Sequence, residues 1–476
     1  MINRLLDRLL GRGPRLSKPR QAKILRGADL GLQRELISPN AIKVCETLQR
    51  AGFKAYLVGG AVRDLLLGIT PKDFDVATNA TPEDVKAEFR RAMIIGRRFR
   101  LVHVMFGREV IETSTFRALN PEAKTDEHGR VLADNLFGSQ SEDATRRDFT
   151  VNALYYDPSS DEVLDYHGGV SDLKKRLIRM IGDPATRYRE DPVRMLRSVR
   201  FAAKLGFTIE EQTRAPIREM AELIHNVPVA RLFDEMLKLL QSGQAMACLR
   251  QLRDAGLHHG LLPLLDVILE QPQGARFVEI ALARTDERVR EGKSISPGFL
   301  FATLLWQQVR TRWEAGIARG DYPIPALMAA IDLALDEQSE QLAIQKRFIA
   351  DMREIWSLQP RFERRTGSQP YRLLEHIRYR AGFDFLMLRT DAGEIEPELV
   401  AWWDRFADGS PNERDTMIAD LARGPGSSST GIGRPRRRRR RSSGSDQGGT
   451  QGDTQGDTQG GTKGDTGGGS EVVSES

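Results

Sequence analysis

The hydrophobic and polar positions of this chain follow two different patterns. Up to about residue 182, short apolar runs alternate with turns marked by glycine or proline, which is typical of mixed helices and strands. From residue 183 to about residue 423, Leu- and Ala-rich helical periodicity dominates, interrupted by single glycines and prolines. The sequence therefore predicts an α+β fold, with a mixed α/β head followed by a long helical region.

Within the head, the alternation of apolar positions predicts individual elements. Apolar runs on either side of Gly107-Arg108 indicate a β-hairpin, and the polar stretch 118–142 indicates a mobile loop. The other predicted elements are helices at 41–51, 61–67 and 82–91, the last with Thr81 as its N-cap, and strands at 55–58 and 73–77.

Composition narrows the class of protein. With 476 residues, of which 40% are hydrophobic, the chain can build several cores. Cys45 and Cys248 lie far apart and outside any Cys-x-x-Cys pattern, which argues against a disulfide framework and a cysteine zinc site and favours a reducing, cytoplasmic setting. The sequence contains no signal-peptide pattern and no apolar run of membrane-spanning length.

The two ends of the chain carry clusters of basic residues. Residues 1–37 are expected to form a flexible leader, or a short basic amphipathic helix that touches a membrane surface or RNA. Residues 424–476 form a Gly/Ser/Thr-rich tail that contains Arg434 and the run 436–441, and we expect this tail to be disordered. It is either a solubilising tail or a sequence-blind RNA-binding arm. The net charge of +5 also favours an anionic partner.

Two carboxylates stand out in the apolar stretch 57–78. On a strand, Asp73 and Asp75 would project from the same side while Phe74 faces the apolar side. Carboxylates held this close repel each other unless a divalent cation lies between them, and Mg²⁺ prefers such hard oxygen ligands. A polar strand edge is the alternative interpretation. Glu112, on the second strand of the predicted hairpin, is either a third metal ligand or an exposed glutamate on the sheet rim.

Three other groups of residues carry candidate chemistry. Gly59-Gly60 follows a strand and opens a helix, which leaves backbone N–H groups free to hold phosphate. Asp148, after Arg146-Arg147, either caps a helix or acts beside a triphosphate held by Arg147, where it binds a ribose hydroxyl or helps to orient the reacting groups. Asp191 is a natural N-cap for a helix with Pro192 at its first position, and one face of that helix carries Arg194, Arg197 and Phe201. This face either forms salt bridges in solvent or reads the edge of a base through Asp191 and Arg194.

Taken together and in this order, these motifs resemble the class II tRNA nucleotidyltransferase and bacterial poly(A) polymerase family over residues 38–240. The resemblance is carried by Gly59-Gly60-x-x-Arg63-Asp64, Asp73-x-Asp75, Arg146-Arg147-Asp148 with Asn152, and Glu190-Asp191-x-x-Arg194.

The resemblance implies a polymerase-β-like nucleotidyltransferase head at 38–180. It also implies a helical neck at 181–245 that binds the nucleotide base and RNA, and a helical RNA-binding body and tail at 246–423. Asp73 and Asp75 would hold Mg²⁺, with Glu112 as a further candidate, and Asp148 would complete the catalytic set. The nucleotide-binding residues implied are Gly59, Gly60, Arg63, Asp64, Arg147, Asn152, Asp191, Arg194 and Arg197.

Within the family, residues 95–104 resemble a signature of the poly(A) polymerase branch, and His103 falls in it. This resemblance implies a template-independent adenylyltransferase that uses ATP to extend single-stranded 3′ ends of mRNA and regulatory RNA, promotes RNA processing and decay, and has the RNA-decay machinery as a candidate partner. A CCA-adding enzyme acting on tRNA and a catalytically inactive RNA-binding relative are the alternatives.

Overall fold

The head is organised around one mixed sheet of eight strands, in the order β1-β8-β7-β2-β3-β6-β5-β4. The computed structural model describes residues 21–96, 100–119, 136–257, 272–339 and 344–423, without the side chains of 272–275 and 339. The strands are β1 (Lys23–Arg26), β2 (Ala55–Val58), β3 (Asp75–Thr78), β4 (Ala92–Ile95), β5 (Leu101–Phe106), β6 (Glu109–Thr115), β7 (Leu154–Asp157) and β8 (Glu162–Asp165).

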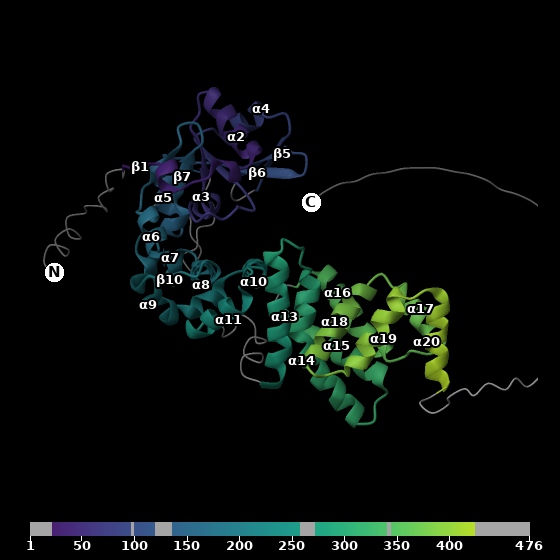
Figure 1. The fold of residues 1–476 in the computed structure, drawn as a ribbon. Helices are drawn as coiled ribbons and strands as arrows, with labels where there is room; N and C mark the ends of the chain where they lie inside the picture. The colour runs from purple at the N-terminus through teal and green to yellow at the C-terminus, as the bar shows by residue number, and fades with distance from the viewer. Residues whose placement is uncertain (1–20, 97–99, 120–135, 258–271, 340–343, 424–476) are drawn as a thin grey trace, which may run out of the picture. The chain divides into compact units, whose positions relative to one another are not determined.

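Most neighbouring strands of this sheet are antiparallel, and the pair β3–β6 is parallel. Helices α2 (Pro39–Arg50) and α4 (Pro82–Glu88) contact strands of the sheet, including β6, and lie beside β5 and β6 in Figure 1. Alternate residues of β5 and β6, including Val102, Val104 and Ile111, are buried in the core. The opposite face of these two strands carries more polar and more exposed side chains.

Local sequence explains where the helices of the head begin. The hydroxyl of Ser38 accepts hydrogen bonds from the amides of Asn40 and Ala41, and Pro39 occupies the first position of α2. Thr81 and Asp84 form a capping box at the start of α4, as expected of the Thr81 N-cap. The other helices of the head are η1 (Ala28–Leu30), η2 (Arg34–Leu36), α3 (Gly60–Leu66), α5 (Gln140–Arg146), η3 (Thr150–Asn152) and α6 (Gly169–Lys175).

The rest of the described chain is helical, except for one small parallel sheet of β9 (Leu177–Ile178) and β10 (Thr208–Ile209). The neck contains α7 (Pro184–Glu190), α8 (Val193–Leu205), α9 (Glu211–Glu219), η4 (Ala221–Asn226), α10 (Val229–Leu240) and α11 (Ala245–Asp254). The body contains α13 (Pro272–Arg290), α14 (Pro297–Ala318), α15 (Pro323–Ser339), α16 (Lys346–Phe362), α17 (Gln369–Leu374), α18 (Tyr379–Asp391), α19 (Pro397–Asp408) and α20 (Pro411–Arg423).

Aromatic side chains fill the body. Trp306 packs edge-on against Phe385, and its indole N–H donates to Glu394, which also pairs with the buried Arg389. A second apolar cluster gathers around Trp403, whose indole N–H donates to the carbonyl of Phe362. The indole N–H groups of Trp306 and Trp403 thus both have partners, as a low-dielectric core requires.

The structure corrects several expectations about the head. The flexible leader predicted for 1–37 is wrong from Lys23 onward, because β1 pairs with β8 at one edge of the sheet. Residues 1–20 lie outside the described part. The predicted strand 73–77 begins only at Asp75, so Asp73 precedes it. Strands β4, β7 and β8 were not predicted, because each has only four residues with little alternation.

The stretch 118–142 is also different from the predicted loop. The last residues of this stretch begin helix α5, because Ser139 and Glu142 form its capping box. A backbone hydrogen bond joins the two ends of the stretch, from the amide of Ala118 to the carbonyl of Leu136. Residues 120–135 lie outside the described part of the chain. The expectation of a disordered tail at 424–476 likewise falls on residues that the structure does not describe.

Both cysteines are buried and free. Burial raises the pKa of the Cys45 thiol well above its usual range, which keeps it protonated and unreactive. In the described ranges, no helix is both long enough and apolar enough to cross a membrane.

One glycine holds the segment that carries Asn152 in place. A Cβ at Gly169 would lie 2.3 Å from the carbonyl oxygen of Thr150, which is backbone and cannot move aside. We expect Gly169→Ala to lower the free energy of unfolding by about 2 kcal/mol, since it forces α6 away from η3. Chemical denaturation would measure this. Gly60→Ala is the matched control, because its Cβ meets only ordinary contacts; equal losses in both variants would contradict the prediction.

Candidate active site

Three carboxylates meet at one end of the sheet. Asp75 is the first residue of β3, and the parallel register places it directly opposite Glu112 of β6. Desolvation and the negative charges of Glu112 and Asp73 raise the pKa of Asp75, Arg147 lowers it, and the resulting pKa is about 6. Asp73 is therefore near enough to act on Asp75, as expected, although it lies before the strand and not on it.

This donor set fits a divalent cation. Desolvation by the surrounding protein and like charge both oppose ionisation of Asp75, and a cation between the carboxylates would reduce that cost. The described residues contain no complete set of three acidic, histidine or cysteine ligands already in place. Such an incomplete acidic site, with positions left for water and phosphate oxygens, suits Mg²⁺.

The glycine turn lies at the end of β2, where α3 begins. Gly59 is the N-cap of α3 and has φ +75° and ψ −129°, which side chains rarely tolerate. A Cβ here would lie 3.4 Å from Nη1 of Arg147, so the guanidinium passes close to the turn. Arg147 is held by the carboxylate of Asp143 at 3.1 Å and by the hydroxyl of Tyr155 at 3.2 Å. The turn and Arg147 therefore form one positively polarised corner beside Asp75.

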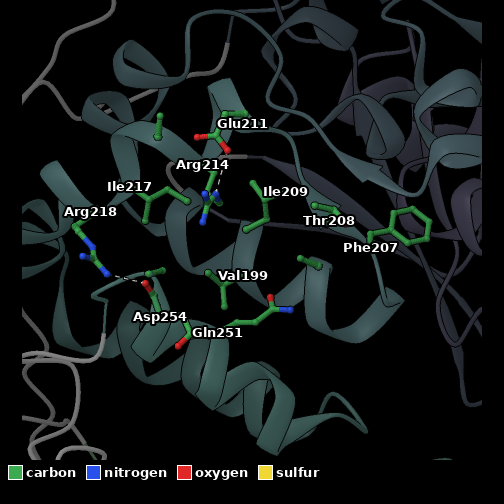
Figure 2. Close-up of a pocket in the computed structure, with 13 residues that line it drawn as sticks. Val199, Phe207, Thr208, Ile209, Glu211, Arg214, Ile217, Arg218, Gln251 and Asp254 are labelled. Atoms are coloured by element: carbon green, nitrogen blue, oxygen red, sulfur yellow. Dashed lines mark hydrogen bonds and ion pairs between the residues drawn. The ribbon is translucent and has the colours of Figure 1, made fainter.

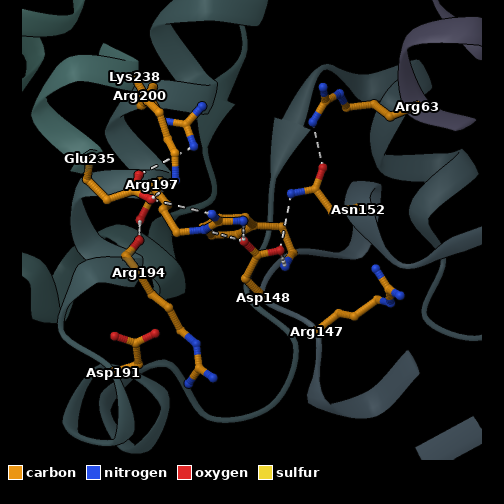
Figure 3. A network of polar contacts seen from close by, with 12 residues as sticks. Arg63, Arg147, Asp148, Asn152, Asp191, Arg194, Arg197, Arg200, Glu235 and Lys238 are labelled. Atoms are coloured by element: carbon orange, nitrogen blue, oxygen red, sulfur yellow. Dashed lines mark hydrogen bonds and ion pairs between the residues drawn. The ribbon is translucent and has the colours of Figure 1, made fainter. Parts of the chain in front are cut away.

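A continuous polar network runs from α3 in the head to α8 in the neck (Figure 3). Arg63 is buried, donates to both Asp64 and Asn152, and lies 5.1 Å from the ring of Phe201. The amide of Asn152 donates to Asp148 at 3.1 Å. Arg63 thus holds Asn152 in place. To bind a nucleotide directly, as expected, Arg63 would have to give up its hydrogen bonds to Asn152 or Asp64.

Asp148 is the link between head and neck. One of its carboxylate oxygens accepts from Asn152 and from the Phe149 amide, and the other accepts from Nε and Nη2 of Arg197 at 2.8 and 2.6 Å. Burial raises the pKa of Asp148, but Arg197 and these hydrogen bonds lower it to about 2. The carboxylate is ionised at physiological pH, and its contribution to stability is lost only as the pH falls below about 4. The side chain of Asp148 does not cap a helix. Asp148 is also not among the charges that raise the pKa of Asp75.

Glu235 of α10 completes the network on the neck side (Figure 3). It is buried and accepts from Lys238 at 2.9 Å, with Arg197 and Arg200 at 3.8 and 3.5 Å. One buried acid therefore balances three cations, and Arg197 is held between it and Asp148. Glu235 was missed in the sequence, because it lies on an amphipathic helix with no motif near it.

The segment expected to read the base has a different local structure from the one predicted. Glu190 ends α7, Asp191 is its C-cap, and Pro192 is the N-cap of α8, so the prediction of Asp191 as an N-cap is wrong. One oxygen of Asp191 accepts from Arg231 at 2.7 Å. Arg194 donates to Glu190 and to the Arg187 carbonyl, which fixes it beside Asp191 (Figure 3). The two residues are thus presented rigidly side by side, and Arg231 was not found from the sequence.

Arg187 ties this segment to the head. Its guanidinium donates to the carbonyls of Arg146 and Arg147 at 2.6 and 2.8 Å. The segment expected to bind the triphosphate and the one expected to read the base are therefore joined by the Arg187 side chain as well as by the pair of Asp148 and Arg197.

A separate cavity of about 720 Å³ lies in the neck between α8, α9, β10 and α11 (Figure 2). Its wall is apolar at Val199, Ile209 and Ile217. At its rim Arg214 pairs with Glu211, and Arg218 donates to the Asp254 carbonyl. No residue of the carboxylate cluster lines it.

Comparison with known families gives three matches along the chain. Residues 55–179 match the poly A polymerase head domain, and residues 206–269 match the probable RNA and SrmB-binding site of polymerase A. Residues 319–443 match the arginine-rich C-terminus of polymerase A.

Relatives and solved structures agree with these matches. The chain is 44% identical to Poly(A) polymerase I of Haemophilus influenzae over 432 residues, covering 87% of this chain and 95% of the relative. It is 45% identical to Poly(A) polymerase I of Salmonella typhi over 428 residues, covering 86% and 89%. The CCA-adding enzyme of Bacillus velezensis is 36% identical over 248 residues, covering only 52% and 62%. The crystal structure of the Bacillus stearothermophilus CCA-adding enzyme in complex with CTP superposes with a TM-score of 0.51 at 27% identity, covering 81% and 82%.

The acidic cluster, the glycine turn and the fold shared with a CCA-adding enzyme define a nucleotidyltransferase with a mixed-sheet head and a helical body. Within that class, the length and identity of the matches decide the branch. The chain belongs to the bacterial poly(A) polymerase family.

The crowding of the carboxylates predicts how stability depends on metal and pH. Because the folded protein raises the pKa of Asp75, the stability gained from its protonation is complete below about pH 4 and lost as the pH rises through about 6. At pH 8 in EDTA, Asp75→Asn should therefore raise Tm by about 2 °C, a small shift because solvent screens this exposed group. Differential scanning calorimetry would measure it.

The control for this measurement is Mg²⁺. Addition of Mg²⁺ should raise the Tm of the wild type at pH 8 and leave that of Asp75→Asn unchanged. A lower Tm for the variant in EDTA would contradict the repulsion inferred for this cluster.

Proposed function

We propose that this protein transfers AMP from ATP to the 3′ end of RNA without a template and releases pyrophosphate, building a poly(A) tail. The observation that carries the proposal is the cluster of Asp73, Asp75 and Glu112 beside the Gly59-Gly60 turn, in a chain 44% identical to a Poly(A) polymerase I. In the reaction, the RNA 3′-oxygen forms a bond to the α-phosphorus of ATP as the bond to pyrophosphate breaks.

The residues of the head supply the reaction centre. Asp73 and Asp75 would hold Mg²⁺, with Glu112 as a further ligand, and when bound it lowers the pKa of the attacking hydroxyl and neutralises charge on the leaving group. Gly59, Gly60 and Arg147 would receive the triphosphate at the positively polarised corner. Asp148 and Asn152 lie between this corner and the neck, where a ribose would compete with Arg197 and Arg63 for their polar atoms.

The neck supplies the choice of nucleotide. Asp191 accepts and Arg194 donates hydrogen bonds, and these two rigidly held groups suit the edge of one base. Because the protein and not a template offers these groups, the same nucleotide is selected in every cycle. Asp64 and Arg197 support this region through Arg63 and Asp148.

RNA is held by the helical region. The match of 206–269 to a probable RNA and SrmB-binding site supports an RNA surface on the neck, and the cavity with Arg214 and Arg218 lies largely inside that range (Figure 2). The arginine-rich match at 319–443 extends this role to the body and tail. The substrates would be single-stranded 3′ ends of mRNA and regulatory RNA in the cytoplasm, with the RNA-decay machinery as partner.

A CCA-adding enzyme is the second candidate, because such an enzyme shares this fold. The CCA-adding relative matches only about half of the chain, whereas the poly(A) polymerases match 86–87% of it. A catalytically inactive RNA-binding protein is less consistent with the site, because it would have no use for carboxylates that repel one another.

Removal of either metal-binding carboxylate should stop the reaction. We expect Asp73→Asn and Asp75→Asn each to lower the rate of ATP incorporation by at least about 100-fold, since the cation is lost while the fold is kept. RNA affinity, measured by filter binding, should stay within about twofold. Glu88→Gln, an exposed acid on α4, is the control and should keep the wild-type rate. Wild-type rates in either aspartate variant would refute the metal assignment.

Deletion of 424–476 should separate RNA affinity from chemistry. The truncated protein lacks Arg434 and the run 436–441, so its RNA affinity should fall. Its affinity should also depend less on salt. The slope of the log binding constant against log salt concentration should become shallower by about 0.7 for each RNA phosphate that these arginines would have neutralised. The maximal rate at saturating RNA should be unchanged. A truncated protein that incorporates no nucleotide would contradict this assignment.

A further inference from the structure

Four residues from four strands form one row across the sheet, and the row ends at the carboxylates. Asp75 of β3 pairs with Glu112 of β6, Glu112 pairs with His103 of β5, and His103 pairs with Met93 of β4. Residues directly opposite each other in a sheet project from the same face. Met93, His103 and Glu112 therefore lie side by side on the face that carries Asp75.

Among the residues that the structure describes, one side of this row is exposed and the other is buried. Toward the middle of the sheet, Asp75 pairs with Val58, and Val58 pairs with Tyr155, which are 1% and 0% exposed. In the other direction, Met93 is 52% exposed, and the side chains of Glu112 and His103 are 54% and 27% exposed. The opposite face of β5 and β6 packs into the core beside α2 and α4 (Figure 1). As far as the described residues go, the open route along the sheet to Asp75 thus runs over β6, β5 and β4.

The chemistry of this open strip suits a nucleobase. His103 offers a flat ring, and Met93 offers a polarizable thioether beside it, with the exposed Val110 at the edge. Nε2 of His103 lies 3.4 Å from Oε1 of Glu112 but makes no hydrogen bond. The ring therefore lies outside the apolar core, and the polar neighbour that the structure gives it is Glu112, at ion-pair distance.

The distances also match one nucleotide. Neighbouring strands lie about 4.8 Å apart, so His103, two strands away from Asp75, lies on the order of 10 Å from it. A nucleotide whose 3′-oxygen is at the carboxylates would place its base over β5. The incoming ATP comes from the other side, because Asp191 and Arg194 belong to the neck segment that Arg187 ties to Arg146 and Arg147.

We propose that His103, with Met93 beside it, binds the base of the 3′-terminal nucleotide of the RNA and so places its hydroxyl at Asp75. This inference rests on the proposed function and deepens it by assigning the RNA end to a site of its own. Stacking on a flat ring tolerates any base, so the site accepts the first RNA end as well as the adenosines added later. A rival role is that His103 only orders Glu112.

The test is single-nucleotide addition by the full-length protein with ATP and Mg²⁺, on two RNAs that differ only in whether the 3′-terminal nucleotide carries its base. For the wild type, the abasic end should raise KM for RNA roughly tenfold. His103→Ala should raise KM for RNA by a similar factor on the normal end, leave KM for ATP unchanged, and abolish the difference between the two RNAs.

Two further substitutions distinguish binding of the base from ordering of Glu112. His103→Phe keeps a flat ring and should restore the preference for the normal end, whereas His103→Gln keeps polarity alone and should not. His167→Ala, which removes a histidine between β8 and α6 of the head, is the matched control and should keep the preference.

Three outcomes would overturn the inference. The wild type would be indifferent to the terminal base, or His103→Ala would keep the full preference, or His103→Gln and not His103→Phe would restore it together with a normal Mg²⁺ requirement. Each of these requires an active wild-type enzyme. If the wild type made no poly(A) at all, the proposed function would fail instead.

Discussion

The parallel pairing of β3 with β6 is the constraint on which the rest of the site depends, because it sets Asp75 directly beside Glu112. This contact is unfavourable by itself, as the raised pKa of Asp75 records. It persists because β3 is hydrogen-bonded to a strand on each side and because the buried residues Val76 and Ile111 pack in the core. The fold thus holds mutually repelling carboxylates together at a place where a bound cation would relieve their repulsion.

The second constraint is the ion pair of Asp148 and Arg197, which joins the reaction centre to the helix expected to read the base. Each member is held by further groups, Asp148 by Asn152 and Arg197 by Glu235. Such a network fixes geometry more than it adds stability, because buried charges lose much of their attraction to desolvation. In the proposed reaction, this network would keep the side chains proposed to read the base at a constant separation from the corner proposed to receive the triphosphate.

Much of this was predictable from local sequence. Gly59-Gly60, the strand before it and the Thr81 cap depend on residues close together in the chain, and their signals are strong. The partners of these residues were not predictable. Glu235, Arg231 and Tyr155 reach the site through tertiary packing and carry no motif of their own. Asp191 shows the limit of a local rule, since its carboxylate bonds to Arg231, 40 residues away, instead of capping the helix that follows.

The most direct test gives the purified protein two RNAs, a generic single-stranded RNA and a tRNA that lacks its 3′ CCA. Each is incubated with Mg²⁺ and labelled ATP or CTP, singly and together, and the products are sized. A poly(A) polymerase should make long ladders with ATP alone on both RNAs. Addition limited to two CMP and one AMP on the tRNA would contradict this prediction and identify a CCA-adding enzyme.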